Sequence, residues 1–255
     1  MKRHRLRDWL FGKKRAPGTG QLPLRPTTEE VRGLILADHA NTRALYVGAF
    51  EPEIASLSDA LTRAFLVNRA IDDLVRDART GHIAAFYLYA LNSLVSSSQL
   101  LVSGMLVPSG NMMRQYGESL ATAMLFCFQF DFYERYTRNP QQFSVKDSIK
   151  HVGKFMARRS SSANRTAWKT FARITKFYDQ FSHASARAVA SQLIFASRGR
   201  LVTIGGGFDP AKLHQYRIEF VRRRSAADVL VPIGVGIAKE LASWKHPQPP
   251  AKPTT

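Results

Sequence analysis

The chain has almost no cysteine, and this absence excludes several classes of site. Cys127 is the only cysteine among 255 residues, so an intrachain disulfide and a metal site built from two or four cysteines are excluded. HExxH, a serine nucleophile elbow and the GxxxxGK[ST] or GxGxxG spacing of nucleotide loops are also missing, although glycines adjoin in "TIGGGFDP" (203–210). We therefore expect no metal, no cofactor and a reducing, cytoplasmic location.

A long apolar run that could cross a membrane is missing as well. Residues 83–113 carry no charge, but Asn92, Gln99 and four serines interrupt the stretch before Leu100. Such polar groups are costly in lipid, so we interpret this stretch as a core helix of a bundle. Residues 1–12, "MKRHRLRDWLFG", lack the apolar core of a secretory signal.

Acidic residues are scarce: 19 Asp and Glu stand against 37 Lys and Arg, and the formal net charge is +18. The positive excess is concentrated in residues 1–15, 146–176 and 198–224. Blocks of one sign repel internally, and phosphate on nucleic acid or lipid is their usual partner. A solvated basic surface without a specific partner is the alternative.

Capping and turn residues divide the chain into helices. A linker, "KKRAPGTGQLPLRP" (13–26), precedes a capping box formed by Thr27 and Glu30. Residues 199–210 are expected to form a loop with a short strand, and Pro232 to kink or split the last helix. The expected helices span about 27–47, 52–79, 82–106, 111–137, a segment from Ser144, 163–197, and a segment from Asp209-Pro210 to 243.

These segments predict an all-α fold, an antiparallel bundle of six to seven helices. A basic arm and linker would occupy 1–26, a single helical domain 27–243, and a disordered tail 244–255. One stretch departs from helical periodicity, because phenylalanines at 126, 128, 130 and 132 alternate as in a strand. The flanks favour a helix, so we expect a helix buried on both sides.

Cations recur every fourth residue along the fifth and sixth expected helices. Like charges one turn apart destabilise a helix by about 0.2–0.5 kcal/mol per pair, and a polyanion laid along the rows would offset this through counterion release. Phe155, Trp168 and Phe171 could stack on bases, or, at helical spacing, belong to the core. The predicted nucleic-acid-binding residues are Lys146, Lys150, Lys154, Arg158, Arg165, Lys169, Arg173 and Lys176.

The sixth expected helix also carries a histidine beside a carboxylate. On a helical wheel His183 lies nearly opposite Phe181, with Asp179 one turn before it and Arg187 one turn after. A carboxylate can orient an imidazole and favour its charged form, which makes His183 a candidate general base. An ordinary surface ion pair is the alternative.

A second charged pair, Arg114 and Glu118, lies between the uncharged and the phenylalanine-rich stretches. Partial burial is expected there, and a buried Arg–Glu pair usually fixes helix register. Tyr178 and Ser182 flank the apolar face of the sixth helix, where they would hydrogen-bond to a neighbour.

The stretches "MRQYGES", "ERYTRNPQQF" and "KFYDQFSHAS", within residues 80–200, resemble a group of uncharacterised bacterial helical proteins, some similar to the HEPN class of ribonucleases and defence proteins. The resemblance implies that Arg114, Glu118, Tyr178, Ser182 and His183 meet in the bundle. The HEPN signature is an arginine, then four to six intervening residues, then a histidine, and two spans have that spacing, "RDARTGH" (76–82) and "RGLILADH" (32–39). His183 has no arginine at that distance.

We expect a protein that binds RNA or DNA phosphates rather than an enzyme. The enzyme alternative is a metal-independent ribonuclease, whose candidate catalytic residues are His183, Asp179, His82 and Arg76. A third hypothesis is a scaffold peripheral to an anionic membrane or docked on a protein, anchored by the face of Leu6, Trp9 and Leu10. A homodimer is compatible with each.

Overall fold

The computed structural model describes residues 27–139, 149, 151–152, 162–181, 185–195, 201–202 and 206–244. Its helices are α2 (Thr28–Ile35), α3 (Ala40–Asp72), α4 (Ala78–Val102), α5 (Leu106–Phe128), α6 (Phe130–Arg138), α8 (Ser162–Tyr178), α9 (Ala186–Gln192) and α10 (Leu213–Ser243), with 3-10 turns η2 (Asp179–Phe181) and η4 (Pro210–Lys212). Strands β1 (Leu193–Ile194) and β2 (Leu201–Val202) form one antiparallel pair.

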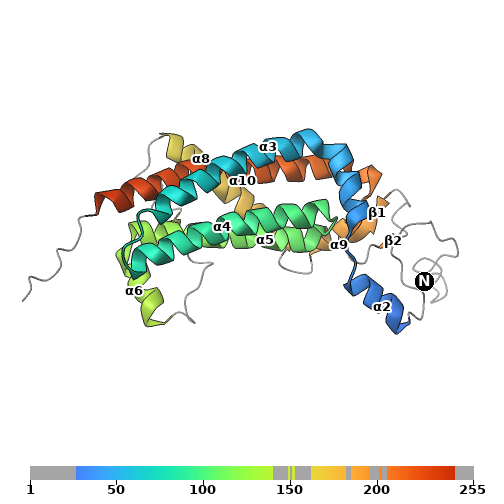
Figure 1. Cartoon of the computed structure of the whole chain (residues 1–255), viewed down its shortest axis with the longest axis horizontal. Coiled ribbons are helices and arrows are strands. Elements are labelled where there is room, and N and C mark those ends of the chain that lie inside the picture. The colour runs from blue at the N-terminus through green and yellow to red at the C-terminus, as the bar shows by residue number, and fades with distance from the viewer. Residues whose placement is uncertain are drawn as a thin grey trace, which may run out of the picture.

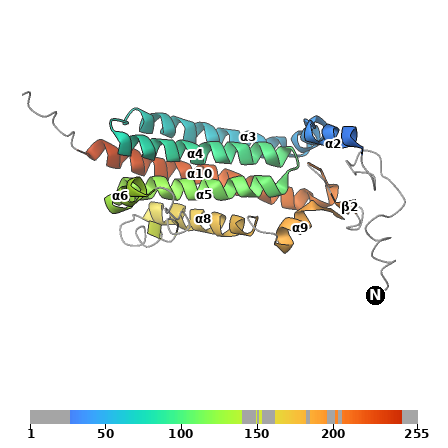
Figure 2. The ribbon, with the colours of Figure 1, turned by 90° about the horizontal axis from the view of Figure 1, so that it is seen from below.

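The long helices lie in three layers. In Figure 1, α3 overlaps α10 and α4 overlaps α5. Figure 2, turned by 90°, shows α3 and α4 on one side, α5 and α10 in the middle, and α8 on the opposite side. Consecutive long helices α3, α4 and α5 alternate in direction, and α8 runs against α5 and α10 (Figure 1). The predicted all-α, antiparallel bundle is therefore confirmed. The arm over 1–26, the tail beyond Trp244 and most of the helix expected from Ser144 lie outside the described residues.

Aromatic side chains fill one end of the core. Tyr46 and Phe50 of α3 are fully buried, and the Tyr46 ring lies 4.9 Å from that of Tyr216 and 5.1 Å from that of Phe208. Phe50 in turn packs 5.2 Å from Phe220 of α10. Tilted and edge-on ring pairs of this kind add about 0.5–1.5 kcal/mol each beyond the area they bury.

The N-terminal helices differ from the expected 27–47 and 52–79. The first segment divides at His39, which has a left-handed backbone (φ 56°), so that α2 and α3 are separate. From there α3 continues through Pro52 to Asp72, with a non-helical residue at Phe50 (φ −135°). Proline removes a backbone donor and clashes with the preceding turn, so the helix breaks just before it. The predicted helix start at Pro52 therefore agrees with the kink at Phe50, where two helices meet within α3, but the second one ends at Asp72 and not near Arg79.

The start of α4 is earlier than predicted. The sequence places a break at Thr80-Gly81, but Asp77 is the N-cap and Thr80 lies inside the first turn. The Asp77 carboxylate accepts from the Thr80 N–H at 2.7 Å, and the Thr80 hydroxyl accepts from the Asp77 N–H at 2.9 Å. This reciprocal capping satisfies two backbone donors that a helix start otherwise leaves free, so Thr80 begins a helix and does not end one.

The alternating phenylalanines mark a break between helices. The predicted continuous helix over 111–137 is wrong, because Gln129 is extended (φ −136°, ψ 98°) between α5 and α6. Arg79 closes the end of α5 by donating to the carbonyls of Phe126 at 2.8 Å and Cys127 at 3.1 Å. The break leaves Phe126 buried and Phe130 about half exposed, an arrangement that one straight helix could not produce.

The predicted helix over 163–197 is also interrupted. It ends as α8 at Tyr178, turns through η2, and resumes as α9 before β1. Phe181 of η2 lies against α5 where Gly110 has no side chain; a Cβ there would be 2.5 Å from the Phe181 ring. Tertiary packing therefore decides this break, which no local stop residue indicates.

The region before the last helix agrees with the predicted loop and short strand. β2 pairs with β1, and Asp209 caps η4 with Pro210 at its first position. The glycine run before Asp209 lies against the α4–α5 connection: Gly104 has φ 75°, and a Cβ on it would lie 2.3 Å from the Gly207 nitrogen. Pro232 was predicted to kink or split the last helix; the split is wrong, because α10 continues through Pro232 to Ser243.

Gly117 of α5 sets the distance between α5 and α8. A Cβ on Gly117 would lie 2.3 Å from Cγ2 of Thr175, so we expect Gly117→Ala to lower the free energy of unfolding by about 1–3 kcal/mol through overpacking. In a Thr175→Ser background, which lacks that methyl group, the same change should cost less than about 0.5 kcal/mol, since alanine favours a helix.

The matched control is Gly236→Ala in α10, where a Cβ meets nothing within 4 Å and a gain of about 0.5–1 kcal/mol is expected. Urea unfolding of the four variants measures these differences. An unchanged cost of Gly117→Ala in the Thr175→Ser background would show that the close contact is not the cause.

Candidate functional site

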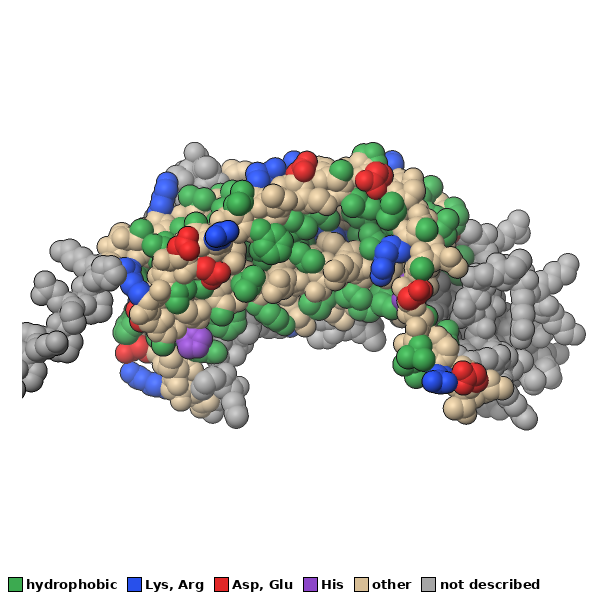
Figure 3. Space-filling view, viewed as in Figure 1, with side chains coloured by type: hydrophobic (Ala, Val, Ile, Leu, Met, Phe, Trp, Pro, Cys, Tyr) green, Lys and Arg blue, Asp and Glu red, His purple; other side chains and the backbone are tan. Residues whose placement is uncertain are grey.

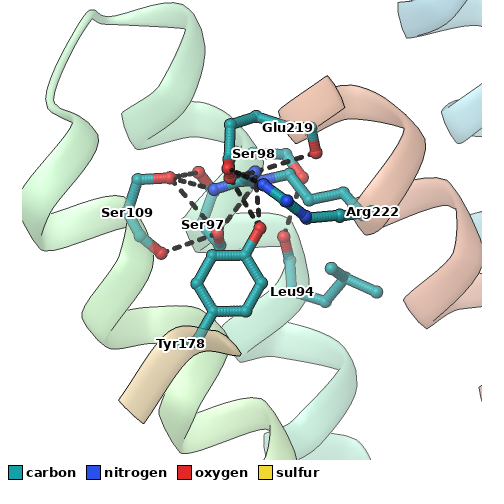
Figure 4. Close-up of polar contacts among 8 residues, drawn as sticks. Leu94, Ser97, Ser98, Ser109, Tyr178, Glu219 and Arg222 are labelled. Atoms are coloured by element: carbon teal, nitrogen blue, oxygen red, sulfur yellow. Dashed lines mark hydrogen bonds and ion pairs between the residues drawn. The ribbon is translucent and has the colours of Figure 1, made fainter. Parts of the chain in front are cut away.

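A buried arginine, Arg223 of α10, is the centre of a polar cluster within the bundle. Its side chain is 1% exposed, and it donates to the Glu219 carboxylate at 2.8 Å, the Tyr178 hydroxyl at 3.3 Å and the Ser97 hydroxyl at 3.1 Å. It also donates to the Ser109 hydroxyl. Figure 4 shows these groups converging from α4, α5, α8 and α10.

Glu219 balances the charge of this arginine. One carboxylate oxygen accepts from the Tyr178 hydroxyl at 2.6 Å and from Arg223, and the other accepts from Arg222 at 2.7 Å. Burial by itself would raise the pKa of Glu219, but Arg223 and the hydrogen bond from Tyr178 outweigh it and lower that pKa. Burial is the main reason why the pKa of Tyr178 is raised. At neutral pH the hydroxyl therefore donates and the carboxylate is ionised.

The serines of the uncharged stretch complete the cluster. The Ser97 hydroxyl donates to the Ser109 carbonyl at 2.8 Å, and the Ser109 hydroxyl donates to the Ser97 carbonyl at 2.7 Å. Both residues are fully buried between α4 and α5. Small hydroxyl side chains let the two helices approach closely and leave oxygens for Arg223, which explains why this core stretch is rich in serine.

Arg114 and Glu118 form the predicted pair on α5. The Arg114 Nε lies 2.7 Å from a Glu118 oxygen and 3.8 Å from an oxygen of Asp179, at the start of η2. Tyr178, the neighbour of Asp179, bonds to Glu219 and Arg223. Arg114, Glu118 and Tyr178 were expected to form one cluster. In the structure Arg114 and Glu118 form one group with Asp179, and Tyr178 belongs to the adjacent group around Arg223. Ser182 and His183 lie outside the described residues.

The pair with the HEPN-like spacing, Arg76 and His82, does not share a contact. The Arg76 guanidinium donates to the Leu241 carbonyl near the end of α10. The His82 Nδ1 lies 3.4 Å from the Tyr133 hydroxyl, and its ring packs 5.6 Å from that of Tyr136. Both residues thus attach the start of α4 to neighbouring helices.

The predicted basic row on the sixth helix lies on the outer face of α8. Lys169, Arg173 and Lys176 are exposed, whereas Phe171 and Ile174 between them are buried. Within the described part of the chain, none of the three cations forms an ion pair. Trp168 and Phe171 stack on each other at 5.0 Å on the inner side, so Phe171 belongs to the core. Of the remaining predicted residues, Lys146, Lys150, Lys154, Arg158 and the side chain of Arg165 are outside the described residues.

The arginines of α10 are used differently. Arg217 pairs with Glu53 of α3 at 2.7 Å, and Arg224 pairs with Asp228 at 3.1 Å. Asp228 also accepts from Arg63 of α3 at 3.1 Å. This part of the 198–224 block therefore fixes α10 against α3, and its charge excess does not form a free basic face. Figure 3, which views the α3 and α4 side, shows acidic and basic side chains intermixed.

Sequence reasoning missed the cluster around Arg223. The sequence has one basic run, Arg222, Arg223 and Arg224. Hydrophobic periodicity did not show that Arg223 is buried and that its two neighbours are not. The available signal was Glu219, four residues before Arg223 in a block otherwise poor in acids.

Arg223 and Arg222 offer a matched pair of substitutions. Arg223→Met leaves Glu219 and two serine hydroxyls without their buried partner, so a loss of about 3–5 kcal/mol of unfolding free energy is expected. Arg222 is 31% exposed, and Arg222→Met should cost less than about 1 kcal/mol. Urea unfolding at pH 7 measures both; equal costs would contradict the central position of Arg223.

The lowered pKa of Glu219 predicts a pH dependence of stability. A carboxyl whose pKa is lower in the folded state stabilises the fold fully above its unfolded value, about 4.3, and loses that contribution as the pH falls through the folded value. We therefore expect the stability difference between wild type and Glu219→Gln to be larger at pH 7 than at pH 3. Glu134→Gln is the control, since this side chain is 42% exposed and its ion pair with Arg138 lies at the surface. An equal difference at both pH values would disprove the linkage.

Among the described residues, no helix has the length and apolar character to cross a bilayer, and no group of three or more His, Cys, Asp or Glu side chains is placed to hold a metal ion. Comparison of the chain with protein-family models, with curated proteins and with solved structures found no match. The resemblance to HEPN-like proteins therefore stays a prediction.

Proposed function

We propose that the outer face of α8 binds the phosphate backbone of RNA or DNA. The supporting observation is the row of Lys169, Arg173 and Lys176, which are exposed, share one face and have no acidic partner among the described residues. The arginines of α10, by contrast, are paired. Cations that stabilise nothing inside a fold, and that repel one another at helical spacing, have a physical use when a polyanion covers them.

The inner face of α8 makes this row rigid. Phe171 and Ile174 are buried against the bundle, and the Thr175 methyl group lies at Gly117 of α5. The seven helical steps from Lys169 to Lys176 rise about 10 Å along the helix axis, close to three base steps of one DNA strand. A fixed row of this length presents charge to neighbouring phosphates without first ordering the backbone.

The proposed footprint extends beyond α8. Arg165 lies one turn before Lys169 on the same helix, and the row from Lys146 to Arg158 precedes it in the sequence. The basic arm over 1–15 would add further charge. Contacts of this kind position a protein on a duplex or single strand and carry no base specificity by themselves.

We propose binding without catalysis. Arg76 and His82 have the HEPN-like spacing, but their polar atoms contact Leu241 and Tyr133. Glu219 and Tyr178 have pKa values shifted away from neutrality in opposite directions, which is unfavourable for proton transfer at pH 7. An RNA probe that is cut during the binding assay would replace this proposal with the ribonuclease alternative.

Salt-dependent binding tests the proposal. Fluorescence anisotropy with a labelled 20-nucleotide RNA and a 20-base-pair DNA is measured between about 50 and 400 mM salt for wild type and for the triple variant Lys169→Gln, Arg173→Gln, Lys176→Gln. Three lost phosphate contacts should reduce the slope of log K against log salt by about 2–3, and affinity at 100 mM salt should fall more than tenfold.

The control triple variant removes the same charge elsewhere, through Arg63→Gln, Arg69→Gln and Lys239→Gln, on exposed positions of α3 and α10. It should change affinity less than about threefold. If both triple variants weaken binding equally, the interaction depends on net charge and not on the row of α8, which contradicts the proposal. Failure of the wild-type protein to bind either probe would also overturn it. Binding to anionic vesicles but to neither nucleic acid would favour the membrane alternative.

A further inference from the structure

A cavity of about 780 Å³ lies between α8, η2, α9 and the first half of α10. Its walls are mainly apolar, and the side chains that matter most here are Leu106, Phe177, Phe181, Phe195 and Ile218. The volume lies within the range of small-molecule sites, which are typically apolar with a few placed polar groups. The proposed nucleic-acid contacts lie on the outer face of α8 and do not use this space.

The wall formed by α9 and Phe195, the residue after β1, is held by η4 and its cap, directly before α10. Asp209 accepts from the backbone N–H of Phe195 at 2.5 Å and from that of Ala211 at 3.0 Å. The Lys212 ammonium donates to the carbonyls of Ala190 and Ser191, at 3.3 and 2.9 Å. Lys212 is 2% exposed and Asp209 3%, so the cavity wall is fixed by buried, charge-assisted bonds and is largely formed before a ligand arrives.

Arg222 supplies a positive charge at the cavity. It lines the space, its guanidinium lies 3.5 Å above the centroid of the Phe177 ring, and its side chain is 31% exposed. Glu219 accepts from it at 2.7 Å, but the same carboxylate also balances the fully buried Arg223. Two arginines thus share one carboxylate, which leaves one positive charge over. Arg222 is the member of the pair that reaches the cavity.

We infer that this cavity binds an amphipathic carboxylate of the long-chain fatty-acid type, with the chain among the phenylalanines and the carboxylate on Arg222. A guanidinium has five N–H donors, and among the described residues Arg222 uses one of them in a hydrogen bond, to Glu219. A carboxylate matches the guanidinium fork, and it neutralises the surplus charge. This inference does not rest on nucleic-acid binding by α8.

The test uses cis-parinaric acid, a fluorescent 18-carbon polyene carboxylate, and its uncharged methyl ester. The full-length protein should bind the acid saturably at one site, and palmitate should displace it at lower concentrations than hexadecanol does. Arg222→Gln should weaken binding of the acid at least tenfold and of the ester less than about twofold. Arg222→Lys, which keeps the charge, should weaken the acid less than Arg222→Gln does.

Two further variants locate the site. Ala190→Phe, which adds a ring inside the cavity, should abolish binding of acid and ester alike, and Lys169→Gln on the outer face of α8 should change neither. Circular-dichroism melting shows whether each variant is folded, and if Arg222→Gln is not, Ala190→Phe and Arg222→Lys decide. Equal affinity for acid and ester, or binding that survives Ala190→Phe, would overturn the inference.

Discussion

The structure depends on the neutralisation of one buried charge, that of Arg223. A guanidinium taken out of water costs several kcal/mol unless its donors are satisfied, and here a carboxylate, a phenol and two serine hydroxyls satisfy them. These acceptors come from four different helices, so the cost is offset only when all four helices have their native register. A purely apolar core would allow helices to slide with little penalty, whereas this network does not. The buried cluster is therefore the feature that specifies how α4, α5, α8 and α10 meet.

The same network separates the basic residues into two groups. On α10, arginines are either buried or paired with acids of α3 and of their own helix. On α8, the lysines and arginine that alternate with buried Phe171 and Ile174 face outward. Helices α8 and α10 contact each other through Tyr178 and Arg223. The cavity lies beside this contact and is lined by Arg222, which carries the positive charge that Glu219 does not neutralise. We thus propose nucleic-acid binding for the outer face of α8 and carboxylate binding for the cavity between α8 and α10. The outer face of α8 is rigid because the opposite face of this helix is packed against the bundle.

Much of the architecture could be predicted from hydrophobic patterning, but helix ends could not. The helix expected over 163–197 is interrupted after Tyr178, because Phe181 packs against α5 at Gly110. Thr80 was expected to end a helix and caps one, since the partner that decides its role is Asp77. Gln129 carries no stop signal, and the break there is stabilised by Arg79, nearly 50 residues away. In each case the local sequence admits two conformations, and a long-range or capping contact chooses between them.

By itself, the sequence determined the helical class, the exclusion of an intrachain disulfide and of a metal site with two or four cysteines, and the outward row on α8. Each of these follows from composition or from a 3.6-residue period. Only the tertiary structure decided which arginine of the run 222–224 is buried and which one reaches the cavity. A sequence gives the number of cationic side chains but does not show which acids they pair with. Coulomb interactions act between residues distant in the chain, and their strength depends on burial. The serines of α4 and α5 and Glu219 became the partners of Arg223 only when the helices packed.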